Sequence, residues 1–84
     1  MTKIDYVAWL IKCFSKSMEM PIDAIHRDFF KEEWLDSFKT LELITEIETT
    51  FDIILSDSAF NDPRFSTIAG LAEILTEIKE MNRT

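Results

Sequence analysis

A serine that follows an aspartate is the residue of this sequence best placed to do chemistry. Asp36 and Ser37 stand immediately before a segment with helical periodicity. Asp36 is a good N-cap for that helix, because its carboxylate can accept the free N–H groups of the first turn. The Ser37 hydroxyl then stays free at a helix N-terminus, where the helix dipole and the unpaired N–H groups favour an attached phosphate. A phosphodiester on Ser37 would therefore sit in a favourable field, although a serine at this position can also simply begin a helix.

The other reactive side chains offer little catalytic equipment. His26 is the only histidine and stands in a polar loop, so we expect a solvated or capping role. A hydrolase that used Ser37 would lack a general base. Cys13 is the only cysteine, which excludes an internal disulfide and a cysteine-based metal cluster, and we expect a half-buried reduced thiol on a helix. The sequence does not predict an enzyme.

Composition limits the size of the fold and the class of partner. The chain has 84 residues, 46% of them hydrophobic, which predicts one domain over residues 1–84 with a modest core. A net charge of −7 repels nucleic acid and anionic lipid and favours basic protein partners. No apolar run approaches the roughly 20 residues of a membrane span, and the N-terminus lacks a signal-peptide pattern. We expect a cytoplasmic monomer without membrane insertion.

The first part of the chain predicts one helix and a long connection. A helix is expected over residues 3–18, ended by Pro21, with an apolar face made of Ile4, Val7, Ala8, Ile11, Phe14 and Met18. The connection from Met20 to Asp36 is long for a structureless loop. Its apolar residues predict that it packs onto the core: Ile22, Ile25, Phe29, Phe30 and Trp34.

The second helix is expected from Ser37 to Phe51 and has two stripes. A core stripe is made of Leu43, Ile44, Ile47 and Phe51. A neighbouring stripe of Phe38, Leu41 and Thr45 is rimmed by Glu42, Glu46 and Glu48. We expect this second stripe and its rim to form a docking surface for partners that present Arg or Lys.

The last part of the chain predicts a packed loop and two more helices. Ile53 to Leu55 is the loop, and Pro63 begins a short helix over residues 62–65. Ser66 or Thr67 caps a last helix over residues 67–81, whose apolar stripe is Ile68, Leu71, Ala72, Leu75 and Ile78. The fold class is all-α: a small bundle of three longer helices and one short helix, with a long loop between the first two.

These motifs resemble the acyl carrier protein family. Residues 34–44, Trp-Leu-Asp-Ser-Phe-Lys-Thr-Leu-Glu-Leu-Ile, resemble the family's Asp-Ser-Leu motif and its acidic helix. Phe51-Asp52-Ile53 and Ser66-Thr67-Ile68 are similar to the segments that close that helix and open the last one, and the order of helices agrees. Within the family, the stretch from Glu46 to Phe60 resembles the D-alanyl carrier group of teichoic acid modification.

The resemblance implies a carrier of acyl or aminoacyl groups. By it, Ser37 is the attachment site of 4′-phosphopantetheine, which a phosphopantetheinyl transferase installs from coenzyme A. An adenylating or acyl-loading ligase would then form a thioester, and a downstream acyl acceptor enzyme would receive the cargo. Trp34 and Lys39 depart from fatty acid carriers, which have Gly and often an acidic residue at these positions. Both departures disfavour service in fatty acid synthesis.

Several alternatives remain open at this level. A stand-alone carrier of a specialised polyketide, aminoacyl or surface-glycan pathway fits as well as a D-alanyl carrier, since the sequence does not name the cargo. An unmodified acidic helical adaptor would use Ser37 only to begin a helix. Trp34 is expected to pack against the loop or the start of the second helix, or else to contact a partner directly.

Overall fold

A computed structural model describes residues 2–16 and 18–81. In these residues the chain forms α1 (Lys3–Ser15), α2 (Ser37–Phe51), α3 (Asp57–Asn61) and α4 (Ile68–Met81). Two 3₁₀ turns complete the order, η1 (Ala24–His26) between α1 and α2, and η2 (Pro63–Ser66) before α4. The predicted all-α bundle with a long loop between its first two long helices is confirmed.

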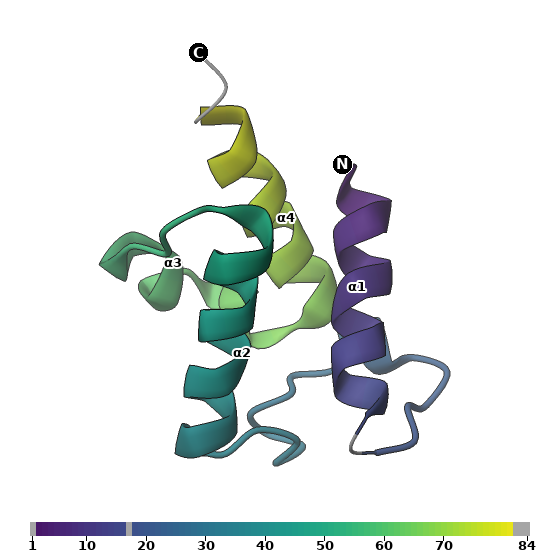
Figure 1. Cartoon of the computed structure of the whole chain (residues 1–84). Helices are drawn as coiled ribbons and strands as arrows, with labels where there is room; N and C mark the ends of the chain where they lie inside the picture. The colour runs from purple at the N-terminus through teal and green to yellow at the C-terminus, as the bar shows by residue number, and fades with distance from the viewer. Residues whose placement is uncertain (1, 17, 82–84) are drawn as a thin grey trace.

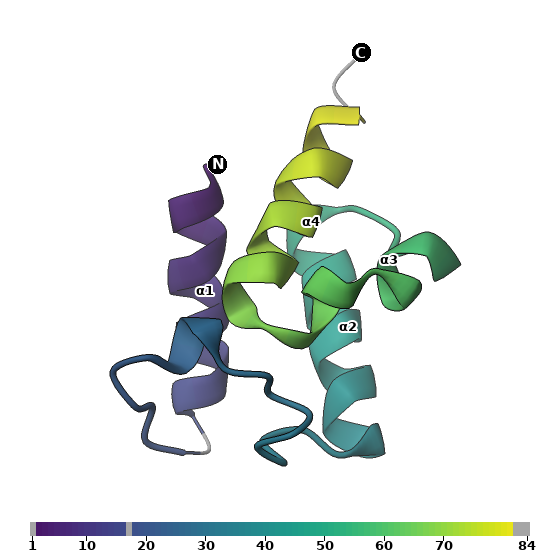
Figure 2. The same ribbon diagram turned by 180° about the vertical axis from the view of Figure 1, so that it is seen from behind.

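The three longer helices run side by side. α1 runs opposite to α2 and α4, so the carboxyl end of α1 and the amino end of α2 lie at the same end of the bundle, next to the long loop (Figure 1). α3 lies on the side of α2 that faces away from α1, as both views show (Figure 2). No helix among the described residues is long and apolar enough to cross a bilayer.

The predicted boundaries of α2 and α4 are confirmed to within one residue. Asp36 is the N-cap of α2, because its Oδ1 accepts the Lys39 N–H at 2.8 Å. Thr67 rather than Ser66 caps α4, since its Oγ1 accepts the Gly70 N–H at 2.9 Å. The predicted core stripes are buried except at Ile44 and Ile78, which are half-buried.

The predicted apolar face of α1 is confirmed only in part, because Phe14 is buried and Val7 and Ile11 are half-buried against the core. The buried residues of this helix are Tyr6, Leu10 and Phe14, whereas Ile4 is 79% exposed and Ala8 is also exposed. The aromatic rings decide the orientation, because Tyr6 packs edge-on against Phe51 of α2, with the two ring centroids 5.0 Å apart. Since α1 carries apolar residues on several faces, its periodicity alone does not select the buried one.

α1 also ends earlier than predicted. The helix stops at Ser15, and Met18 lies outside it. Ser15 and Lys16 are exposed, so neither of them buries apolar surface that would extend the helix. The start of the helix is fixed by a capping box, in which Thr2 and Asp5 bond each other's backbone N–H.

The short-helix region differs from the prediction. A helix that the sequence did not suggest, α3, covers Asp57–Asn61, and residues 63–66 form the 3₁₀ turn η2 with Asp62 as its N-cap. Pro63 stands at the first position of this turn, as expected for a helix start. The predicted helix over 62–65 is therefore a tighter turn, and Ala59 is the one residue of α3 that is buried.

The long loop packs onto the core through part of its apolar residues. Phe29 is fully buried, and its N–H donates to the Ser66 carbonyl at 2.8 Å, which ties the loop to the residues before α4. Ile25 and Trp34 are half-buried against the core. Phe30 is partly exposed but its ring packs against Phe29 and Phe65, so the prediction that the loop packs onto the core is confirmed, with Ile22 as the exposed exception.

Candidate functional site

Ser37 is the first residue of α2 and is exposed. Asp36 accepts the Lys39 N–H with its carboxylate and the Thr40 N–H with its carbonyl, so the cap uses no atom of Ser37. Within the described chain, no hydrogen bond engages the Ser37 Oγ or the N–H groups of Ser37 and Phe38. A hydroxyl free to react therefore stands beside unpaired donors at the positive end of a helix.

The predicted docking residues gather on one face of α2. Phe38 and Leu41 are 69% and 63% exposed, so this face presents two large apolar side chains to solvent. An open hollow of about 350 Å³ lies over this face, and it is lined by Phe38, Leu41, Glu42, Thr45 and Glu46. The structure thus brings together five of the six predicted docking residues within the first half to two-thirds of the helix.

Glu48 is the sixth, and its environment is different. Its side chain is half-buried, and its Oε2 accepts the Leu55 N–H at 2.9 Å. This bond holds the loop after α2 against the helix. The Glu48 carboxylate therefore has a structural role that the sequence did not reveal.

A second, narrower hollow opens on the α1 side of the same helix end. Its volume is about 180 Å³, and its lining comes from three segments that are distant in sequence: Cys13, Phe14, Lys16, Leu35, Lys39, Glu42, Leu43 and Glu46. Leu35 and Lys39 stand two residues before and two residues after Ser37. The sequence analysis did not predict this cluster, although the spacing of Lys39, Glu42 and Glu46 places the three side chains on one side of the helix.

Cys13 links α1 to this hollow. Its thiol donates to Glu46 Oε2 at 3.6 Å, and the residue is half-buried, as expected from the sequence. Burial raises the pKa of the Cys13 thiol to about 11, and the negative charge of Glu46 adds to the shift. The thiol is therefore protonated at neutral pH.

Trp34 packs on a different partner from the one expected. Its ring lies edge-on to Phe14 of α1, with centroids 6.2 Å apart, and its backbone N–H donates to the Phe29 carbonyl at 3.0 Å. The side chain is half-buried. The aromatic contact therefore fixes the last turns of the loop to α1 just before the chain enters α2.

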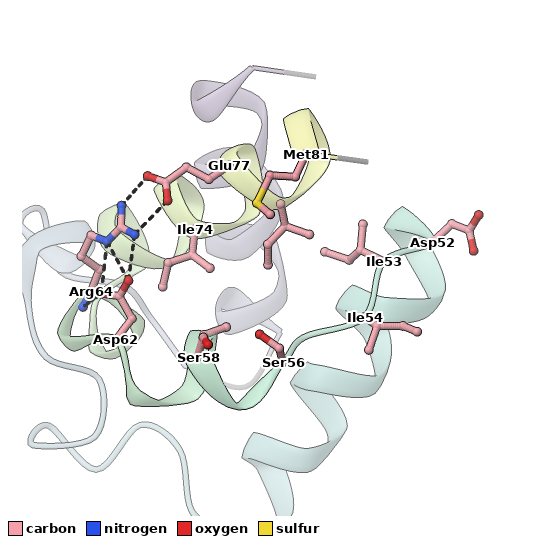
Figure 3. Close-up of a pocket in the computed structure, with 12 residues that line it drawn as sticks. Asp52, Ile53, Ile54, Ser56, Ser58, Asp62, Arg64, Ile74, Glu77 and Met81 are labelled. Atoms are coloured by element: carbon pink, nitrogen blue, oxygen red, sulfur yellow. Dashed lines mark hydrogen bonds and ion pairs between the residues drawn. The ribbon is translucent and has the colours of Figure 1, made fainter. Parts of the chain in front are cut away.

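The opposite end of α2 holds a wider hollow of about 570 Å³. Its walls include Ile53, Ile54, Ile74 and Met81, and Figure 3 shows Arg64 at one side between Asp62 and Glu77. The hollow lies near Asp52, and a helix of 15 residues separates it from Ser37 by about 20 Å. It is not part of the serine site.

The sequence matches a known family over most of its length. Residues 8–75 match the family described as the phosphopantetheine attachment site. The D-alanyl carrier proteins of Streptococcus mutans, Streptococcus thermophilus and Streptococcus sanguinis are each 37% identical over 62 residues, which cover 74% of this chain and 78% of theirs. Among solved structures, none matches the chain significantly.

The residues around Ser37 fit the family's prosthetic group, 4′-phosphopantetheine. Its phosphodiester needs an accessible hydroxyl and a field that favours an anion, and the exposed Oγ at the start of α2 offers both. When bound, the group supplies a terminal thiol that holds acyl groups as thioesters. The chain belongs to the phosphopantetheine-binding family of acyl carriers, which are carriers and not catalysts.

Proposed function

We propose that Ser37 is the attachment residue and that this chain carries an aminoacyl group, D-alanine, to an acceptor enzyme. The observation that supports attachment at Ser37 is that Asp36 and Ser37 have separate roles at the start of α2. Asp36 caps the helix, which leaves the exposed Ser37 Oγ for the phosphodiester. The likeness to proteins named D-alanyl carrier protein supports the choice of cargo.

The carrier's residues act by holding and presenting the arm. Asp36 keeps the first turn of α2 ordered, and the unpaired N–H groups of Ser37 and Phe38 offer the phosphodiester a favourable field. A thioester on a tethered arm meets a docked partner at high effective concentration, so the carrier needs no catalytic group.

The docking surface of this carrier is the exposed face of α2. We assign to it Phe38, Leu41, Glu42, Thr45 and Glu46, with Glu48 at its edge. The apolar centre and acidic rim suit transferase, ligase and acceptor surfaces that present an apolar side chain flanked by Arg or Lys. The Glu48 oxygen that binds Leu55 limits what this residue can offer a partner.

Intact mass spectrometry tests the attachment. Incubation of the chain with coenzyme A and a phosphopantetheinyl transferase should add the mass of one arm. Ser37→Ala should gain nothing and keep its helical spectrum, because Asp36 still caps α2. Ser58→Ala, which changes another exposed serine, should gain the arm like the unmutated chain.

The outcomes of this test distinguish attachment at Ser37 from attachment elsewhere and from no attachment. An arm on Ser37→Ala would show that another residue is the attachment site. An unmutated chain that gains no arm would favour the unmodified adaptor. Loading of the modified chain by a D-alanine-adenylating ligase, compared with other amino acids and short acyl groups, then tests the cargo.

A further inference from the structure

A groove runs between α1 and α2 and reaches the end of the bundle where the carboxyl end of α1 lies next to the amino end of α2 (Figure 1). It consists of the narrow hollow and of a neighbouring hollow of about 490 Å³, which share Cys13, Lys16 and Glu46. We call the two hollows together the α1–α2 groove. Its wall on α1 is mainly one helix face, because the residues are spaced by three and four: Trp9, Lys12, Cys13 and Lys16.

Three lysines without a partner gather in this groove. Elsewhere in the described chain, four basic side chains are engaged by a carboxylate or a carbonyl: Lys3, Arg27, Arg64 and Lys79. Lys12, Lys16 and Lys39 are exposed, and none of them forms an ion pair with residues 2–16 or 18–81. All three line the α1–α2 groove. An acidic chain therefore keeps a set of unpaired positive charges on one surface.

Neither a shortage of carboxylates nor helix stability explains this placement. The chain has 16 acidic residues and 9 Lys and Arg residues, and Glu42 and Glu46 stand on the α2 wall of the same groove. Lys12 and Lys16 lie at the carboxyl end of α1, where a positive charge favours the helix dipole. That effect accounts for their position along α1 but not for the face they share, since a cation on any face of the last turn has it.

The groove adjoins the proposed docking surface. Glu42, Thr45 and Glu46 line both the docking hollow and the groove. A specific protein interface covers about 20–30 residues on each partner, whereas five residues line the docking hollow. A partner that docks on α2 must therefore also cover a neighbouring element, and the open face of α1 beside these shared residues is available to it.

We infer that the ligase that loads the arm also covers the α1–α2 groove and presents Asp or Glu to Lys12, Lys16 and Lys39. The inference rests on the proposed docking surface and aminoacyl cargo, and it adds a second charge pattern to them. The partner meets acidic groups on α2 and basic groups on α1, so only one orientation satisfies both. Charges of opposite sign on adjacent elements fix the orientation of a docked partner and disfavour other partners.

Single charge reversals test the inference. With the arm attached, Lys12→Glu and Lys16→Glu should each raise KM for loading by a D-alanine-adenylating ligase about three- to ten-fold and leave kcat unchanged. Lys16→Arg keeps the charge and should behave like the unmutated chain. Lys31→Glu is the matched control, because it makes the same change in net charge at an exposed lysine that lines neither hollow. Added salt should shrink the differences, since exposed charges are screened.

Other outcomes would overturn the inference. Equal KM values for Lys12→Glu, Lys16→Glu and the unmutated chain would remove α1 from the interface, and an equal rise in Lys31→Glu would assign the effect to net charge. Unchanged KM with lost binding to phosphatidylglycerol vesicles would assign the lysines to a membrane surface. Far-UV circular dichroism of each variant separates a loss of fold from a loss of docking. An unmutated chain that carries the arm but is not loaded would contradict the proposed cargo, and with it this ligase as the occupant.

Discussion

The two ends of α2 differ in how many of their groups are already engaged. At the Ser37 end, Asp36 supplies the cap, and the apolar side chains of Phe38 and Leu41 remain exposed. At the far end, Lys79 of α4 donates to the Phe51 carbonyl at 2.8 Å, and Glu48 holds the Leu55 N–H. Asp52 closes the helix in the left-handed conformation, with φ of 54°.

Near the far end of α2, Arg64 adds ion pairs that join η2 to α4. Its guanidinium pairs with Asp62 at 2.8 Å and with Glu77 at 2.6 Å. The hydrogen bonds from Arg64 lower the pKa of both carboxyl groups. One end of α2 is thus fixed to the rest of the bundle, while the other leaves Phe38 and Leu41 exposed to solvent. The comparison teaches that the contacts that stabilise α2 and the surface proposed for docking lie at different ends of a single helix.

Gly70→Ala should give the largest loss of stability, because it disturbs the contact between η2 and α4. A Cβ at this position would lie 2.2 Å from the Arg64 carbonyl oxygen and 2.8 Å from its Cα, both backbone atoms. We expect a loss of about 3 kcal/mol of unfolding free energy, as in an overpacked core. Urea titration measures it. Ala69→Ser on the preceding residue should cost less than about 1 kcal/mol, and equal losses would contradict the close approach.

Trp34→Ala should have the next largest effect. Full truncation of a buried aromatic costs about 3–5 kcal/mol, and the half-buried ring should cost about 1–3 kcal/mol. Trp34→Phe should recover part of the loss, because it can still contact Phe14. Thermal unfolding followed by far-UV circular dichroism measures the effect, because this readout does not depend on the chain's two tryptophans. An unchanged melting temperature with lost loading would assign Trp34 to partner recognition instead.

Asp36→Ala should cost about 0.5–2 kcal/mol through the lost N-cap. The modification rate should fall as well, because the first turn that presents Ser37 becomes less ordered. Asp36→Asn is the matched variant, since asparagine caps helices about as well as aspartate. If Asn behaves like Ala in urea titration, the cap is not what Asp36 contributes.

Phe38→Ala and Leu41→Ala should have the smallest effect on stability, within about 0.5 kcal/mol, because both side chains are exposed. Each should reduce kcat/KM for loading by roughly five- to ten-fold, as truncation of an interface anchor does. Ile54→Ala is the control, since Ile54 is 82% exposed at the opposite end of α2. Equal loading by all three variants would remove the docking surface from this face.

Much of the fold could be predicted because local signals agreed with tertiary packing. α2 has an N-cap at Asp36 and a core stripe with helical spacing, and α4 has the same combination at Thr67. The buried face of α1 was predicted only in part, because the packing of Tyr6 on Phe51 joins residues 45 apart and leaves no local pattern. The sequence did not predict α3, because a helix of five residues is too short to show a helical period of apolar residues.

Part of the candidate site could likewise be predicted from the sequence, and part could not. Ser37, its cap and the exposed stripe on α2 follow from one continuous segment, and the structure places them together. The narrow hollow needs Cys13, Leu35 and Lys39 from separate segments, so it could not be read before the chain was folded. Glu48 was predicted as part of the acidic rim, and its bond to Leu55 depends on the path of the loop.

The protonated state of Cys13 has a chemical consequence for a carrier of thioesters. A thiolate beside a thioester would take the acyl group by exchange and leave the cargo stranded on the protein. The thiolate is the reactive form, and burial beside Glu46 raises the pKa of Cys13 to about 11. At neutral pH this side chain is therefore a hydrogen-bond donor and a poor nucleophile for a thioester.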